Sequence, residues 1–419
     1  MIFEYPGAIL IIIILAVLFA LWKSYIFRII PLPIIKKFPK PTGKFKIGTF
    51  FCHWIDPDRK NPHPDISKKQ INRDLMIQIW YPSDEKDPHQ TYLKYMAHKP
   101  RWPFPLRDNF KKIKTHTVEN AEISKKQSKF PVIIFSHGMG ATKEGYSIFL
   151  EELASHGFVI VGADHTHSCG LTILPDGQKI TMIKDLAPKL LSSSWARNMA
   201  KENKVNRKDI DFILGPLKSL NENFKSRFYK KLDLENIGII GHSMGGIATV
   251  EACRTNDLLK AGINLDGWHD AVNTTEGFNK PFMFLLGEES RYVGTPKEPL
   301  IKTLKNVGGT KRRYFNWIKK VQKEIAEFCK NNGPNTHQII IKKAGHIAFT
   351  NLILGKSKVI KMLDLNIGHV KPNKTIPLMN DYIVTFFNKY LYKKESASIE
   401  KLNKLYEKEI SLTFEGEKK

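Results

Sequence analysis

The chain has 419 residues, of which 42% are hydrophobic, so it can bury a large core, and we interpret it as one catalytic domain with an anchor and a tail. Its formal net charge of +25 favours anionic partners such as a phospholipid surface or nucleic acid. Nucleic-acid binding is disfavoured, because the scattered lysines are not accompanied by zinc-finger spacing, an RNA-recognition signature or a basic-region heptad. Four widely spaced cysteines argue against a disulfide framework and favour reduced thiols: Cys52, Cys169, Cys253 and Cys329.

An almost uninterrupted apolar segment runs from Pro6 to Trp22 and contains no charged residue. Its length is close to the lower limit for crossing a bilayer, roughly 17 to 25 residues. A secretory signal peptide is the alternative, but Glu4 is the only charged side chain before the segment, and bulky residues follow it where a cleavage site needs small ones. The sequence therefore favours an uncleaved transmembrane anchor over residues 1–24.

Residues 25–40 form a basic and apolar linker after the anchor. Positive charge on this flank predicts that the linker and the catalytic domain face the cytoplasm, with secretion after signal cleavage as the alternative. The same composition suits a segment that lies along an anionic leaflet, and it equally suits an ordinary stop-transfer flank. The membrane surface is thus a predicted partner, and the oligomeric state is unknown.

Strand and helix patterns follow one another through residues 41–395, which we assign to the catalytic domain. Two alternating segments, 44–49 and 75–81, predict antiparallel strands at one edge of a sheet. Further strands are predicted at 131–135, 158–161, 237–240, 261–265, 281–286 and 337–341, with helices at 146–155, 193–220 and after residue 246. This alternation predicts an α/β-hydrolase fold: a mostly parallel central sheet, helices on both faces and an antiparallel N-terminal edge.

Residues 294–334 interrupt the alternation with a basic helical insertion. Its apolar residues recur at helical spacing: Ile318, Val321, Ile325 and Phe328. The pattern suits a lid or interfacial helix, but it favours a helix packed on the sheet. A last helix is predicted at 376–392, and the charged tail of residues 396–419 is expected to be solvated.

The run Gly241-His242-Ser243-Met244-Gly245-Gly246 lies between a strand pattern and a helix pattern. This context predicts a nucleophile elbow, a sharp strand-to-helix turn that presents Ser243. Glycines on either side of the serine suit such a turn, because side chains there would collide with the neighbouring strand and helix. A serine hydroxyl is a weak nucleophile at its own pKa, so the prediction also requires a histidine base and an acid.

His346 is the predicted base, because it follows a late strand and comes last in the chain order serine, acid, histidine. The acid has competing candidates. Asp266 ends the strand after the elbow helix, whereas Glu288 and Glu289 follow the next strand, where many α/β-hydrolases have Gly-x-x-Asp. The usual aspartate is missing there, so we predict Asp266, with Asp270 as a nearby alternative.

An acyl-transfer site also needs two backbone N–H groups for the oxyanion. One should come from Met244, the residue after the nucleophile, and the other from the loop 137–140, where Met139 is the candidate. His165 and His167 resemble part of a metal site, but no further ligands lie at a suitable spacing. Neither a Walker loop nor a dinucleotide fingerprint occurs, so no metal or cofactor is expected.

Taken together, these motifs resemble the platelet-activating factor acetylhydrolase family, the calcium-independent lipoprotein-associated phospholipases A2. The resemblance spans about 41–392 and rests on the segments 135–140, 153–158, 164–165, 241–246 and 262–268. It implies that Ser243 is the nucleophile, Asp266 the acid and His346 the base. It also implies that Met139 and Met244 supply the oxyanion N–H groups.

The resemblance further implies a serine esterase that hydrolyses the sn-2 short or oxidised acyl ester of glycerophospholipids. The sequence departs from the family pattern in two places that bear on the acyl pocket: a longer segment after Glu289, and the apolar residues 347–349 after His346. A general carboxylesterase of the dienelactone-hydrolase type is the second interpretation. A catalytically idle membrane scaffold is the third, and the complete set of three catalytic residue types argues against it.

Overall fold

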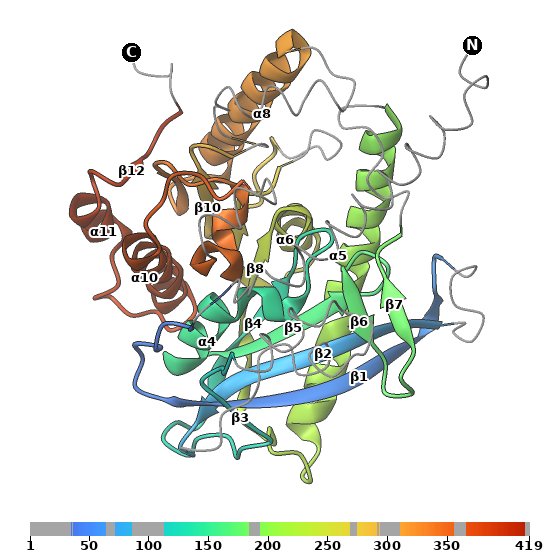
Figure 1. Cartoon of the computed structure of the whole chain (residues 1–419). Helices are drawn as coiled ribbons and strands as arrows, with labels where there is room; N and C mark the ends of the chain where they lie inside the picture. Colours follow the sequence, from blue (N-terminus) through green and yellow to red (C-terminus); the bar gives the residue numbers. More distant parts are fainter. Residues whose placement is uncertain are drawn as a thin grey trace, which may run out of the picture.

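The computed structural model describes residues 35, 37–63, 72–85, 113–183, 193–268, 275–290, 293, 311–355 and 366–414 (Figure 1). The predicted anchor at 1–24, most of the predicted linker, and Asp270 lie outside these residues. Within the described ranges, no helix combines the length and the apolar character needed to cross a membrane.

Ten strands of the described chain form one sheet in the order β12-β11-β10-β9-β8-β4-β5-β2-β1-β3. Their bounds are Lys46–Lys60 (β1), Asn72–Ser83 (β2), Thr117–Glu119 (β3), Phe130–Ser136 (β4), Val159–His165 (β5), Leu232–His242 (β8), Leu259–Leu265 (β9), Phe282–Gly287 (β10), Thr336–Ile341 (β11) and Ile410–Ser411 (β12). The strands from β5 to β11 are parallel, whereas β2 is antiparallel to both β5 and β1. The predicted parallel sheet with an antiparallel N-terminal edge is confirmed. Leu171–Ile173 (β6) and Lys179–Thr181 (β7) form a separate hairpin.

Helices cover both faces of this sheet (Figure 1). Successive residues of a strand point to opposite faces, so Ile133 and Phe135 of β4 join one core cluster and Val132 and Ile134 join the other. The first cluster contains apolar residues of the helices Ser147–Ser155 (α4) and Pro372–Tyr390 (α10). The second contains apolar residues of the helices Ser193–Glu222 (α5), Met244–Thr255 (α6) and Lys311–Asn332 (α8). This arrangement is the predicted α/β-hydrolase fold.

The helix predicted within residues 294–334 is α8, and its apolar face is buried in the second core cluster: Ile318, Val321, Ile325 and Phe328. Packing against the sheet, the favoured interpretation, is therefore confirmed. The charged side chains of the predicted solvated tail are exposed or half-buried over residues 399–414, but this segment also contains the helix Ile399–Leu405 (α11) and strand β12. Many residues of this segment are charged, but Ile399, Ile410 and Phe414 are buried, and β12 pairs with β11 at the sheet edge.

Candidate active site

Strand β8 ends at His242 and helix α6 begins at Met244, so Ser243 occupies the turn between them. Its φ of 55° and ψ of −119° are strained for a residue with a side chain. The flanking glycines make this turn possible: a Cβ on Gly245 would lie 2.1 Å from the carbonyl oxygen of Ser136, and one on Gly241 would lie 2.2 Å from the carbonyl oxygen of Gly245. The strand, turn and helix predicted around Ser243 are thus present.

Two loops bring the predicted base and acid to this turn. His346 opens the short 3₁₀ helix His346–Phe349 (η4) that follows β11, and its Nε2 lies 3.0 Å from the Ser243 Oγ. Its Nδ1 lies 2.6 Å from Oδ2 of Asp266, the fully buried residue after β9. Asp266 also accepts hydrogen bonds from the Gly287 N–H and the Ser290 hydroxyl. A carboxylate held in this way keeps the proton on Nδ1, so that Nε2 faces the serine as an acceptor.

The other predicted carboxylates point elsewhere. Glu288 accepts the backbone N–H of Lys343 at 2.8 Å, and Glu289 lies 2.6 Å from Nδ1 of His369. Of the three carboxylates compared as the acid, Asp266 is the one that lies against the His346 imidazole. The geometry therefore favours Asp266 over the two glutamates.

The two predicted oxyanion donors lie on either side of the nucleophile. Met244 begins α6, where the partial positive charge of the helix N-terminus favours an anion. Met139 lies in the loop after β4, and this loop reaches the elbow: a Cβ on Gly138 would lie 3.1 Å from the Ser243 Cβ. Within the described part of the chain, neither the Met139 nor the Met244 N–H has a hydrogen-bond acceptor. Both N–H groups are thus available to a ligand.

The apolar residues after His346 have a packing role. Ala348 and Phe349 are fully buried in the first core cluster. The Phe349 ring also stacks on the His242 ring, with centroids 6.0 Å apart. These apolar residues therefore form part of the core behind the histidine loop.

A buried polar network, which the sequence analysis missed, supports the loop that carries Met139. Arg73 of β2 forms two hydrogen bonds to Asp209 of α5, at 3.0 and 2.5 Å, and Asp209 lies 2.9 Å from His165 Nδ1. The backbone N–H of His165 donates to His137 Nε2 at 2.9 Å, which fixes the start of the loop. Burial alone would raise the pKa of Asp209, but the Arg73 charge and the hydrogen bonds from His165 and Arg73 hold that pKa below its usual value.

Replacing Arg73 with methionine is expected to lower the free energy of unfolding by about 3 kcal/mol, because it removes the main cation beside a buried carboxylate. Arg59 also contacts Asp209, at 2.9 Å, which keeps the loss at the lower end of the range. Denaturant unfolding measures the effect, and the double variant Arg73→Met/Asp209→Leu should recover much of it. Equal unfolding midpoints of Arg73→Met and wild type would contradict the assigned role.

His137 makes the stability sensitive to acid. Its Nδ1 donates to the Gly138 carbonyl and its Nε2 accepts from His165, so only the neutral ring satisfies both contacts. Burial, together with the nearby His165, lowers the pKa of His137 from 6.5 to about 4. Between these two pH values the unfolded chain binds the extra proton, so stability is fully present above pH 6.5 and falls as the pH drops towards 4.

The expected loss from His137 alone is about 3 kcal/mol over this interval. Urea unfolding at a series of pH values measures it, and His137→Asn should show a shallower pH slope, although His167 and His337, with pKa values also lowered to about 4, still contribute. An identical slope in the variant and the wild type would exclude His137 as a source.

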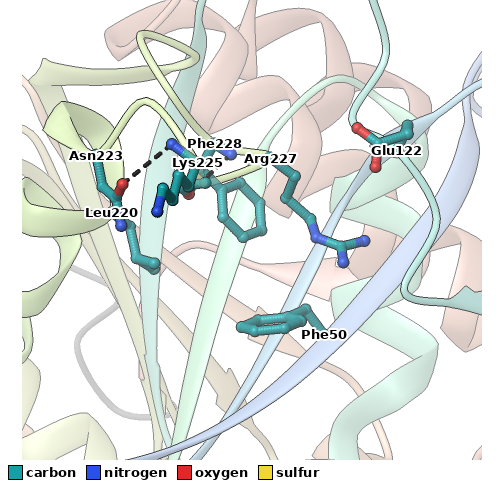
Figure 2. Close-up of a pocket in the computed structure, with 8 residues that line it drawn as sticks. Phe50, Glu122, Leu220, Asn223, Lys225, Arg227 and Phe228 are labelled. Carbon is teal, nitrogen blue, oxygen red and sulfur yellow. Dashed lines mark hydrogen bonds between the residues drawn. The ribbon is translucent and has the colours of Figure 1, made fainter.

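A cavity of about 390 Å³ lies at the opposite end of the sheet, near the first residues of β8 (Figure 2). Figure 2 shows the Arg227 guanidinium between Phe50 and Glu122, and it lies 5.2 Å from the Phe50 ring centroid. Strand β4 pairs with β8 from Leu232 to Gly241 through its residues Phe130–Ser136, so the two ends of β8 lie only about 20 Å apart, with Ser243 beyond the far end. The cavity is therefore distinct from the candidate active site.

Comparison with known proteins assigns the family. The model of the family described as platelet-activating factor acetylhydrolase, isoform II, matches residues 34–410. A platelet-activating factor acetylhydrolase of Cavia porcellus is 24% identical over 375 residues, covering 82% of this chain and 79% of the relative. A probable 1-alkyl-2-acetylglycerophosphocholine esterase of Arthroderma benhamiae is 23% identical over 387 residues, covering 86% and 89%.

The solved structure of a ferulic acid esterase from Streptomyces cinnamoneus resembles this one in fold, with a TM-score of 0.63 at 23% identity, covering 86% of this chain and 94% of that one. The family model spans most of the sequence, and the fold agrees with it. The protein therefore belongs to the platelet-activating factor acetylhydrolase, isoform II, family and is a serine ester hydrolase.

Proposed function

We propose that the protein is a calcium-independent serine esterase that removes a short or oxidised acyl group from the sn-2 position of a glycerophospholipid. The observation that supports it most is the contact of His346 with Ser243 on one side and Asp266 on the other, in a chain of this family. The names of the relatives, acetylhydrolases and an acetylglycerophosphocholine esterase, point to the same substrate class.

In the proposed reaction, the Ser243 Oγ attacks the ester carbonyl while His346 Nε2 takes its proton. The carbonyl oxygen becomes an oxyanion, which accepts hydrogen bonds from the N–H groups of Met139 and Met244. His346 then protonates the departing lysophospholipid oxygen, and the acyl group stays on Ser243. Water attacks this acyl-enzyme with His346 again as base, which releases the carboxylic acid and restores the serine. Asp266 stabilises the imidazolium in both halves.

The proposed calcium independence rests on assigning each catalytic task to a group of the protein. A metal ion in an esterase polarises the carbonyl or activates water. Here the polarising groups are the Met139 and Met244 N–H groups, and the activating group is His346. Every step therefore has a protein group assigned to it.

We also propose that residues 1–24 anchor the enzyme in a membrane and that the linker and the net charge of +25 favour an anionic surface. The flanking charges favour a cytoplasmic catalytic domain, with signal cleavage and secretion as the alternative. Fractionation of cells that make the full-length protein tests the anchor. Recovery in the membrane pellet after a high-salt wash is expected, whereas release by salt would leave only surface binding.

The substrate is tested with full-length protein in detergent and two phosphatidylcholines, one with an sn-2 acetyl group and one with a long sn-2 acyl chain, with EDTA present. Ser243-dependent release of acetate, and little release of the long chain, is expected. Cleavage of a simple ester but of neither phospholipid would select the general carboxylesterase. Cleavage of none of the three would select the idle scaffold, and loss of acetate release with EDTA would overturn calcium independence.

A further inference from the structure

Three loops of the candidate active site meet at the side chain of His242, the residue before the nucleophile. Its Nδ1 lies 2.8 Å from the hydroxyl of Tyr146, at the end of the short 3₁₀ helix Lys143–Tyr146 (η2). Its Nε2 lies 3.0 Å from the main-chain oxygen of His346. The Tyr146 hydroxyl also accepts the backbone N–H of Gly138 at 3.1 Å. The chain of contacts thus runs from the oxyanion loop to the base loop through the elbow.

Chemistry sets the direction of each of these hydrogen bonds. A main-chain oxygen can only accept, so the His242 Nε2 must carry a proton. The ring is neutral, because burial and the nearby His346 lower the pKa of His242 well below its usual value. A neutral ring protonated on Nε2 accepts at Nδ1, so the Tyr146 hydroxyl donates to it. Every polar atom of the imidazole is then paired in a buried site.

These bonds act on the two parts of the site that must be placed accurately. Gly138 precedes Met139, so the bond from the Gly138 N–H to Tyr146 fixes the 137–138 peptide, which directly precedes the peptide that ends in the Met139 N–H. The loop packs closely against the elbow at this point, because a Cβ on Gly138 would lie only 3.0 Å from His242 Nδ1 and 3.1 Å from Ser243 Cβ. At the other end, the bond to the His346 oxygen fixes the main chain of the base, and the two imidazole centroids lie 4.6 Å apart.

We propose that Tyr146 and His242 are positioning residues: Tyr146 holds the oxyanion loop against the elbow through Gly138, and His242 holds the main chain of His346. Neither residue touches the substrate in this scheme. The inference rests on the proposed roles of Ser243, His346 and Met139, and it adds the groups that set their relative positions. Because it concerns the hydrolytic step, it holds for any ester that the enzyme cleaves.

The contacts of Tyr146 with Gly138 and His242 form the oxyanion arm of this arrangement, and the contact of His242 with the His346 oxygen forms the base arm. Tyr146→Phe tests the oxyanion arm, because it removes the hydroxyl but keeps the ring, which packs on Phe135 at a centroid distance of 4.7 Å. Displacing one oxyanion donor should lower kcat for 4-nitrophenyl acetate about 10- to 100-fold, somewhat less than deleting a donor, with KM within about 2-fold. The matched control is Tyr382→Phe, because Tyr382 is also buried and its hydroxyl donates to Asn403 at 2.9 Å on α11. Both variants should lose similar stability, but only Tyr146→Phe should lose kcat. A kcat loss no larger than that of Tyr382→Phe would overturn the proposal.

Two substitutions at His242 separate the two arms. In His242→Gln the amide nitrogen reaches the position of Nε2 and can still donate to His346, but the acceptor for Tyr146 is lost. In His242→Asn the amide oxygen takes the position of Nδ1 and can still accept from Tyr146, but the bond to His346 is lost. We expect the double variant Tyr146→Phe/His242→Gln to lose no more kcat than the worse single variant, because both act on one arm.

Combining Tyr146→Phe with His242→Asn damages both arms, so there the losses should multiply. Multiplying losses in Tyr146→Phe/His242→Gln would contradict a shared arm. If Tyr146→Phe does not fold, His242→Gln is measured in its place, provided that this variant folds. A loss of kcat at constant KM in His242→Gln would support the proposal, and a wild-type kcat would overturn it. Ser243→Ala, assayed in parallel, reports on the proposed function separately, because its activity does not depend on Tyr146.

Discussion

Ser243→Ala is expected to lower kcat for a simple ester at least about 10⁵-fold, because the hydroxyl forms the acyl-enzyme and no other group occupies its position. The variant should also lose covalent labelling by a fluorescent organophosphonate, which reacts with activated serines. Both effects should appear without a loss of stability, because alanine fits the turn no worse than serine does. Intact-protein mass spectrometry measures the labelling directly.

Ser155→Ala is a suitable control, because Ser155 is a buried serine whose hydroxyl donates to the main chain of Glu152, within α4. It should be labelled as fast as the wild type. Equal labelling of Ser243→Ala and wild type would remove Ser243 from the mechanism, together with the elbow interpretation.

Asp266→Asn is expected to lower kcat about 10⁴-fold while KM changes little. The asparagine fits the same space, but its amide group must accept from the Gly287 N–H and so presents NH₂ to His346 Nδ1. The imidazole is then driven to carry its proton on Nε2, where it cannot accept the serine proton. Steady-state kinetics measure the loss, and the unfolding midpoint shows that the fold is kept.

Glu288→Gln and Glu289→Gln serve as controls for this experiment, because they neutralise the competing carboxylates of the next loop. Both variants should keep kcat within about 3-fold, as expected for groups that do not contact the imidazole. A loss in Glu289→Gln as large as that in Asp266→Asn would reassign the acid.

The central part of the fold could be predicted because its signals are local. The β8 strand, the glycine-flanked serine and the α6 helix are contiguous in sequence, and each parallel strand contains a short apolar run. His346 and Asp266 could be predicted by their places after strands, because the C-terminal ends of parallel strands share one edge of the sheet. Choosing Asp266 over the glutamates rested on a missing aspartate and on the resemblance, and the contact with His346 now favours the same residue.

The parts that could not be predicted depend on partners far apart in sequence. Arg73 and Asp209 are 136 positions apart, and Tyr146 and His242 are 96 positions apart. Neither pair has a sequence pattern of its own, although an arginine in an apolar strand is a usable signal for a buried partner. Strand β1 was predicted to end at residue 49, but it runs to Lys60 because β2 supplies hydrogen bonds along its polar half. Tertiary pairing there overrides local composition.

The three proposed catalytic residues follow strands at different distances from the edge of the sheet. Ser243 follows β8 and Asp266 follows β9, both central strands, whereas His346 follows β11, which is flanked on its outer side by the two-residue β12. Amide protons near the edge of a sheet exchange through local opening, while those of central strands wait for complete unfolding. On warming, we therefore expect the histidine loop to detach first. Enzyme activity should then fall reversibly at temperatures at which the amide groups of β8 are still protected from hydrogen exchange.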